Sequence, residues 1–210
     1  DAVREAEDGG ILRVCDDGVV FRHELARHAI ENEVPVLCRR RLHRAVISAL
    51  RSQVQPDPVL LTHHAARAGD VETVIEFAPR AGRDAAAAGS HRQALVCFEA
   101  VAKHADRLPL AERADALNDY AWELHNAHRF IDALEVCERA VALYIRIGDP
   151  AALSLARVRL SRLNYLAGNT DQAQIVARQA VEQHEPTACG MTNLGTILAL
   201  CGDPGASRTL

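Results

Sequence analysis

The sequence predicts an all-α protein with one small β-hairpin near its N-terminus. Of its 210 residues, 49% are hydrophobic but only 4% are aromatic, so the core has to be built from Ala, Leu, Val and Ile. Ala is the best helix former, and small side chains let helices approach closely. A glycine followed by a capping residue or proline recurs between helical segments, as at Gly148-Asp149-Pro150. These short breaks predict antiparallel neighbouring helices.

The first part of the chain is the only one with strand character. Residues 11–15 and 19–21 are rich in β-branched and aromatic residues and flank an Asp-Asp-Gly turn, which predicts a hairpin. Residues 1–8 predict the end of a helix that stops at Gly9-Gly10. A helix, a hairpin and a second helix in this order form the end of a winged-helix unit. We therefore expect residues 1–53 to be the end of a winged-helix domain with connecting helices.

From residue 23 onward the pattern is helical, and residues 58–210 are expected to form a helical arm. The predicted helices span residues 23–32, 35–52, 58–68, 70–87, 90–105, 109–127, 130–147, 150–167, 170–184 and 187–201. The chain begins without Met and stops where a further helix should begin, so we expect it to be a piece of a larger protein.

The helical hairpins repeat a pattern that is typical of tetratricopeptide repeats. In that pattern the first helix carries a large apolar residue before a small one, as at Tyr120-Ala121, and the second helix carries small residues seven apart, as at Ala133 and Ala140. The second helix lies against two first helices, so a larger side chain would push the hairpin open. The repeat is long, since 40 residues separate Ala133 from Ala173. The sequence therefore predicts a tetratricopeptide-like solenoid with stretched repeats.

Charge gives no reason to expect nucleic acid as a direct partner, because the net charge is −4. The strongest basic cluster, Arg39-Arg40-Arg41 with Arg44, could contact phosphates or form a solvent-exposed helix face. We favour the exposed face, with Leu42, Val46 and Leu50 packing inward, because the interleaved aromatics needed for base stacking are absent.

The cysteines and the hydropathy pattern indicate the cellular compartment in which we expect the chain. Six cysteines contain no CxxC pair, and we expect most to be buried free thiols in a reducing cytoplasm. No apolar run approaches the ~18 residues that a membrane-spanning helix needs. The expected localisation is cytoplasmic.

Three motifs together resemble a known family. They are Phe21-Arg-His-Glu-Leu25, Arg40-Arg41-Leu42-His43-Arg44 and His63-His64-Ala-Ala-Arg-Ala-Gly-Asp70. In this order and spacing they resemble the middle of large ATP-binding LuxR-type transcriptional regulators, which are STAND-class ATPases. Such proteins have a nucleotide-binding domain, a winged-helix domain, a tetratricopeptide-like sensor arm and a C-terminal helix-turn-helix. The resemblance covers essentially the whole chain.

The resemblance implies a nucleotide-sensing role for His23, with Arg22 beside it. In related switch ATPases a winged-helix histidine in an F-x-H pattern touches the phosphates of bound ADP. An imidazole N–H is suited to donate to an anionic oxygen. The alternative is that His23 caps or packs the first turn of the following helix.

The arm offers a second set of candidates. Solenoids bind ligands on the concave face that their first helices line. The sole tryptophan, Trp122, lies on such a helix, and Asn118, Arg159 and Arg162 could face the same groove. The alternative, that Trp122 packs between repeats, stays open.

No residues suggest catalysis, a metal or a cofactor in this chain. There is no GxxxxGK[ST] loop and no Gly-x-Ser-x-Gly elbow. His63 and His64 are adjacent, so one should pack while the other faces solvent. His125 and His128 have a spacing that could hold a metal, but they sit at a predicted turn where polar residues are expected. We expect no enzymatic activity, with ATP or ADP bound only by an ATPase domain outside this sequence.

The expected function is the sensor arm of such a regulator. The arm would receive a protein or small-molecule inducer and act on the ATPase and DNA-binding domains of the parent chain, with oligomerisation in the active state. Two alternatives remain: a stand-alone tetratricopeptide scaffold that binds peptides, and the regulatory middle of an adenylyl cyclase-type protein, since similar middles occur behind cyclase domains.

Overall fold

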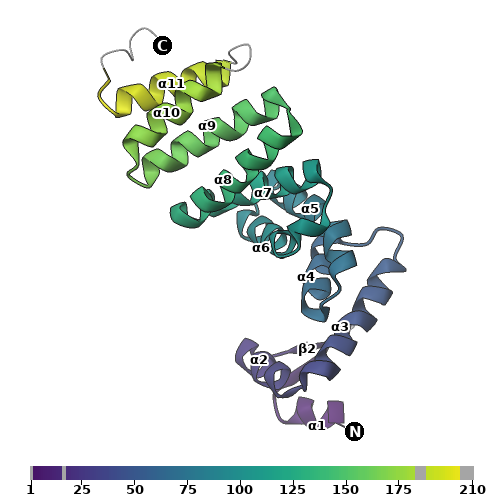
Figure 1. Ribbon diagram of the computed structural model, residues 1–210. Helices are drawn as coiled ribbons and strands as arrows, with labels where there is room; N and C mark the ends of the chain where they lie inside the picture. Colours follow the sequence, from purple (N-terminus) through teal and green to yellow (C-terminus); the bar gives the residue numbers. More distant parts are fainter. Residues whose placement is uncertain (1, 16–17, 183–187, 204–210) are drawn as a thin grey trace.

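The computed structural model describes residues 2–15, 18–182 and 188–203 and shows a stack of antiparallel helices with a small N-terminal lobe (Figure 1). The arm consists of α4 (Pro58–Ala68), α5 (Val71–Ala87), α6 (His91–Ala102), α7 (Leu110–Asn126), α8 (Phe130–Ile147), α9 (Pro150–Leu166), α10 (Thr170–Glu182) and α11 (Ala188–Leu200), with a short 3-10 turn η1 (Ala105–Arg107) after α6. The predicted solenoid and its helix order are confirmed. The predicted helix over 90–105 is too long, because the chain tightens into the 3-10 turn after Ala102.

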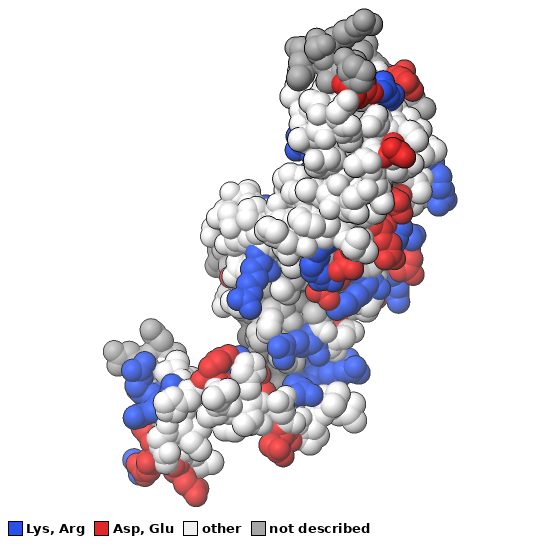
Figure 2. All heavy atoms as spheres, turned by 90° about the vertical axis from the view of Figure 1, so that its left-hand side faces the viewer, with Lys and Arg blue, Asp and Glu red and all other residues white. Residues whose placement is uncertain are grey.

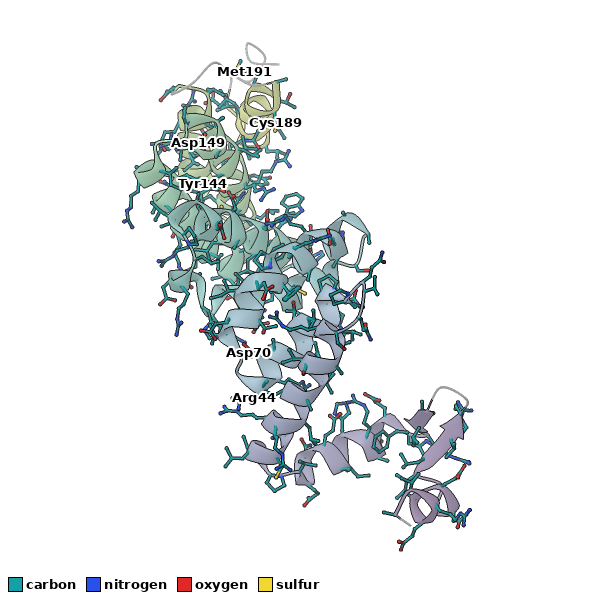
Figure 3. All side chains as sticks on the ribbon, turned by 90° about the vertical axis from the view of Figure 1, so that its right-hand side faces the viewer. Arg44, Asp70, Tyr144, Asp149, Cys189 and Met191 are labelled. Carbon is teal, nitrogen blue, oxygen red and sulfur yellow. The ribbon has the colours of Figure 1, made fainter. Side chains whose placement is uncertain are left out.

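The N-terminal lobe contains the predicted hairpin. Strands β1 (Leu12–Cys15) and β2 (Gly18–Phe21) pair antiparallel, with Leu12 opposite Phe21. Helices α1 (Ala2–Asp8) and α2 (Glu24–Glu33) flank the hairpin. Figures 1 and 3 show the lobe standing away from the arm; α3 (Val36–Arg51) begins in the lobe and joins it to the arm.

The buried face of α3 differs from the predicted one. Leu42 and Val46 are exposed, and Ile47 is the residue of α3 that is buried. Ile47 and Leu50 pack in one cluster with α4, and His43 contacts the same helix. The prediction that Leu42 and Val46 face inward is therefore wrong, because α4 covers a face rotated by one residue, which is about 100° on a helix.

Side-chain caps explain where several arm helices begin. Asp57, Asp70 and Asp149 each accept a hydrogen bond from a backbone N–H in the first turn of α4, α5 and α9. Asp70 and Asp149 are labelled in Figure 3. Such caps satisfy N–H groups that have no partner within the helix.

Small residues form the contacts between the repeats, as predicted. Ala94, Ala133, Ala140 and Ala173 are fully buried on the second helices of successive hairpins. The sequence did not indicate one further small position, Gly82 of α5. A methyl group added there would lie 2.7 Å from the ring of Phe98 on α6. The α5–α6 pair is therefore built around this glycine and this aromatic ring.

The cysteines are less buried than expected. All six are free thiols, but only Cys97 and Cys137 are buried. Burial raises the pKa of both thiols, to about 11 for Cys97 and about 12 for Cys137. Among the described residues, no helix is both long and apolar enough to cross a bilayer.

Candidate functional site

The predicted groove residues come together on the first helices α7 and α9. The guanidinium carbon of Arg159 lies 5.2 Å from the centre of the Trp122 ring, a cation–π arrangement. The same guanidinium donates to the main-chain oxygen of Asn118 at 3.0 Å. The structure thus brings Asn118, Trp122 and Arg159 into one site, which we call the Trp122 site.

Trp122 also contacts a histidine of its own helix. The rings of Trp122 and His125 stack with centroids 5.0 Å apart, and His125 also contacts Phe130 at 5.8 Å. The Nδ1 atom of His125 is buried and has no hydrogen-bond partner among the described residues. Trp122 itself is half-buried. One part of Trp122 therefore packs and another part stays accessible, and its role in binding stays a prediction.

Arg162 extends the site towards α11. Its Nε donates to Oδ1 of Asn193 at 3.0 Å, and the Asn193 amide donates to the Ser161 hydroxyl at 2.7 Å. Asn193 and Ser161 are buried, whereas the Arg162 side chain is exposed. This chain of hydrogen bonds fixes the Arg162 guanidinium next to the cavity that Trp122 lines.

A carboxylate completes the charges of the site. Asp119 lies 3.6 Å from Arg83 of α5. Burial raises the pKa of Asp119, while the neighbouring Arg159 and Arg83 oppose that rise. The Oδ1 atom of Asn118 is buried without a hydrogen-bond partner in the described part of the chain. The site thus combines the cations Arg83, Arg159 and Arg162 with one carboxylate, while the amide oxygen of Asn118 is buried.

The cavity beside Trp122 is very small. It measures about 10 Å³ and is lined by Ala121, Trp122, His125, Arg159, Arg162 and Leu163. That is about the volume that one water molecule needs. The rings of Trp122 and His125 and the Arg159 guanidinium leave little free volume between them. The site is therefore an accessible surface and not a pocket that could enclose a ligand.

The nucleotide-sensing candidates lie at the other end of the molecule. Nε of Arg22 donates to the main-chain oxygen of Leu12 at 3.1 Å, which holds Arg22 on the hairpin. His23 takes the N-cap position of α2, is exposed, and makes no side-chain capping hydrogen bond. The structure therefore keeps these two candidates apart from the Trp122 site, and their role stays a prediction.

The histidine pairs behave as structural groups. Nδ1 of His64 lies 2.8 Å from Nδ1 of His43, while His63 is exposed, so one histidine of the adjacent pair packs as predicted. His125 lies in the last turn of α7, where it stacks on Trp122, and not in the turn between α7 and α8. No cluster of three or more metal-ligating side chains occurs among the residues that the structure describes.

Sequence reasoning missed several members of the site. Asp119 and His125 lie three residues before and after Trp122, so helical spacing alone places them on the same face. Arg83 and Asn193 come from other hairpins. No local pattern links them to Trp122, and only the packing of the helices brings them near.

This chain is similar to solved structures in its fold, whereas the two comparisons by sequence find no match. No family model and no curated protein matches it. The crystal structure of a kinesin light chain-like protein from Podosopora anserina with nearly identical TPR-like repeats matches with a TM-score of 0.59 at 17% identity, over 82% of this chain and 90% of that one. A single-substitution form of the same protein matches with a TM-score of 0.60, over 82% and 89%.

These matches show the fold of this chain. It is a tetratricopeptide-like helical solenoid. At 17% identity the likeness concerns the arrangement of helices and not the side chains of the Trp122 site.

Proposed function

We propose that this chain is the protein-interaction and signal-sensing arm of an ATP-dependent, LuxR-type STAND regulator, and that the Trp122 site receives the partner. The solenoid supports the interaction half of the proposal, because stacked repeats present extended concave surfaces. The regulator half rests on the three sequence motifs described above. No enzymatic step is assigned to the chain.

The observation that carries the proposal is the cation–π pair of Trp122 and Arg159, which lies on an accessible face. Tryptophan and arginine are the residues that most often dominate binding energy at interfaces. The side chains are held before any partner arrives, by the Arg159–Asn118 and Arg162–Asn193 hydrogen bonds. Such preorganisation lowers the entropy lost on binding.

The size of the cavity favours a protein over a small molecule as the signal at this site. Drug-sized ligands usually occupy pockets of about 300–1,000 Å³. The cavity beside Trp122 measures about 10 Å³. A partner that lays its own side chains over the Trp122 ring needs no such chamber. We therefore propose a protein partner here, in place of a small inducer.

The N-terminal lobe supports the idea of further domains in the parent chain. Leu25 and Leu37 are among the most exposed apolar side chains, and Leu42 is also exposed. Apolar surface of this kind commonly marks an interface. In the proposal, the ATPase domain covers this lobe and His23, with Arg22, faces the phosphates of ADP. The cytoplasm is the compartment that this role requires.

The mechanism we propose is a population shift. A partner on the arm favours an open form, nucleotide exchange follows, and oligomerisation exposes the DNA-binding domain. A partner can shift this equilibrium only by the difference between its affinities for the two forms.

Nucleotide exchange in the full-length parent tests the proposal. Release of a fluorescent ADP analogue is measured for the parent, for a form lacking residues 90–210, and for Trp122→Ala/Arg159→Ala. Deleting the arm should change the release rate, because the closed state loses a restraint. If the ADP analogue were released at the same rate with and without residues 90–210, the regulator proposal would be wrong. The stand-alone scaffold, with which the fold is also compatible, would then remain.

A further inference from the structure

A second concave surface lies between α4 and α6. Its volume is about 690 Å³, far larger than the cavity beside Trp122. Val74 of α5 lines it, whereas Arg83 of the same helix reaches Asp119 at the Trp122 site. Arg83 follows Val74 by nine positions, which is about two and a half helical turns, so these side chains leave α5 on opposite sides. The α4–α6 groove is therefore a separate surface.

The inner lining of the α4–α6 groove is apolar. Val74, Cys97 and Ala100 are buried beneath it. Leu60 of α4 and Val96 of α6 line it with 45% and 53% of their surface exposed. Two large aliphatic side chains left half-exposed inside a hollow offer contact area to an apolar side chain from a partner.

The rim of the α4–α6 groove is basic. Arg67, Arg92 and Lys103 contribute three fixed positive charges, and Glu99 is the only carboxylate among the described residues that line it. Glu99 pairs with Lys103 at 3.1 Å. Arg67 and Arg92 have no ion-pair partner in the part of the chain that the structure describes, although the whole chain carries a net charge of −4. The rim is therefore positive where the molecule overall is negative.

We propose that the α4–α6 groove binds an acidic peptide segment with apolar side chains on one face. Carboxylates would pair with Arg67 and Arg92, while the apolar face would cover Leu60 and Val96. Helices α4 and α6 have 11 and 12 residues, so the groove runs for about 16–18 Å, enough for about three turns of a bound helix. The proposal concerns a different surface from the Trp122 site and does not depend on the regulator role.

Other ligand classes fit the lining less well. A small anion would need the cations but would leave Leu60 and Val96 uncovered. Single-stranded nucleic acid usually stacks its bases on aromatic rings. No Phe, Tyr or Trp occurs among the described residues that line the groove. An acidic, apolar peptide matches both the charge and the lining.

The binding test uses a designed peptide as the probe. A fluorescein-labelled peptide of about 14 residues places Leu on one helical face and Glu elsewhere, and a reference peptide has the same composition in scrambled order. Fluorescence anisotropy should show that the Leu-faced peptide binds at least about tenfold more tightly than the scrambled one, because only it presents charge and apolar area together. Equal binding of the two peptides, or full competition by inorganic phosphate or oligo-dT, overturns the proposal.

Matched variants locate the binding surface. Arg67→Glu/Arg92→Glu should weaken binding by about tenfold or more, since it reverses the rim charge. The control Arg139→Glu/Arg146→Glu changes the net charge equally on exposed positions of α8 and should stay within about twofold. Circular dichroism checks folding, and Arg67→Gln/Arg92→Gln replaces the reversal if that variant unfolds. Equal losses in the groove and control variants overturn the proposal.

Discussion

The N-terminal lobe and the helical arm are both largely helical, yet they differ in how their side chains are buried. Among the described residues, none before Ile47 is buried, whereas every arm helix from α4 to α11 contributes buried residues. The lobe keeps its shape through local contacts, such as the hairpin register and the pairing of Arg27 with Glu24 and Glu31 on α2. The arm keeps its shape through packing between repeats.

This difference shows that secondary structure and core formation are separate outcomes. The lobe has apolar residues at helical spacing, but among its described residues no neighbouring element buries them fully. The arm buries many Ala side chains, and each repeat is covered by the next. A helical pattern therefore predicts where helices form, while burial depends on whether a second element lies opposite.

The largest expected effect compares two phenylalanines. Phe98 in the arm is 1% exposed and Phe21 in the hairpin is 37% exposed. Phe98→Ala should lower the free energy of unfolding by about 3–5 kcal/mol, because it removes a buried ring and leaves a cavity. Phe21→Ala should lower it by less than about 1 kcal/mol. Urea unfolding followed by circular dichroism measures both, and equal losses would contradict the contrast between lobe and arm.

The next effect tests the contact between Gly82 and Phe98. Gly82→Ala should lower the free energy of unfolding by about 1–2 kcal/mol, since overpacking against the buried ring outweighs the better helix propensity of Ala. Combining it with Phe98→Leu gives the control, because a smaller side chain makes room for the new methyl group. The double variant should lose less than the sum of the two single losses. If the two losses were additive, Gly82 and Phe98 would not be energetically coupled.

A third effect concerns the junction between lobe and arm. His43 of α3 and His64 of α4 face each other with Nδ1 atoms 2.8 Å apart. One nitrogen has to donate and the other accept, so the accepting ring has to be neutral and the contact is lost when both rings are protonated. Burial lowers the pKa of both histidines below the ordinary value of 6.5, and the nearby charge of Arg67 adds to this.

The direction of the pH effect follows from these lowered values. At pH values between the lowered pKa values and 6.5, the unfolded chain binds more protons than the folded chain. The contribution of these two histidines to stability is therefore fully present above pH 6.5 and is lost as the pH falls. The melting temperature should drop between pH 7.5 and 5.0, with a smaller drop for His43→Gln, whose amide can still bond to His64. His104→Gln serves as the control and should keep the full drop. An unchanged pH dependence in His43→Gln would rule out the pair as its source.

The sequence predicted the helices well because their limits are set locally. Asp149 caps α9 and the glycine before it ends α8, and both signals are readable without a neighbour. The buried alanines of the repeats were predicted for the same reason, since helix pairing requires small residues at fixed spacing.

The face of α3 could not be predicted, because two sets of apolar residues fit the same periodicity. Leu42 with Val46 and Ile47 with Leu50 lie on neighbouring faces, and the position of α4 decides between them. The Trp122 site was predicted in part, since Trp122 and Arg159 lie on first helices. The link from Arg162 to Asn193 crosses from α9 to α11 and depends on tertiary packing.

The smallest expected effect is in the lobe. Leu37 lies in the first turn of α3 and is 79% exposed. Leu37→Ser should change the free energy of unfolding by no more than about 0.5 kcal/mol, because exposed side chains contribute little to stability. Its counterpart in the arm, Leu117→Ser, removes a fully buried side chain and places a hydroxyl in the core, so it should cost several times more. If Leu37→Ser instead destabilised the chain as strongly as Leu117→Ser, the lobe would have to be packed against another surface in solution, and the difference in burial between lobe and arm would not hold.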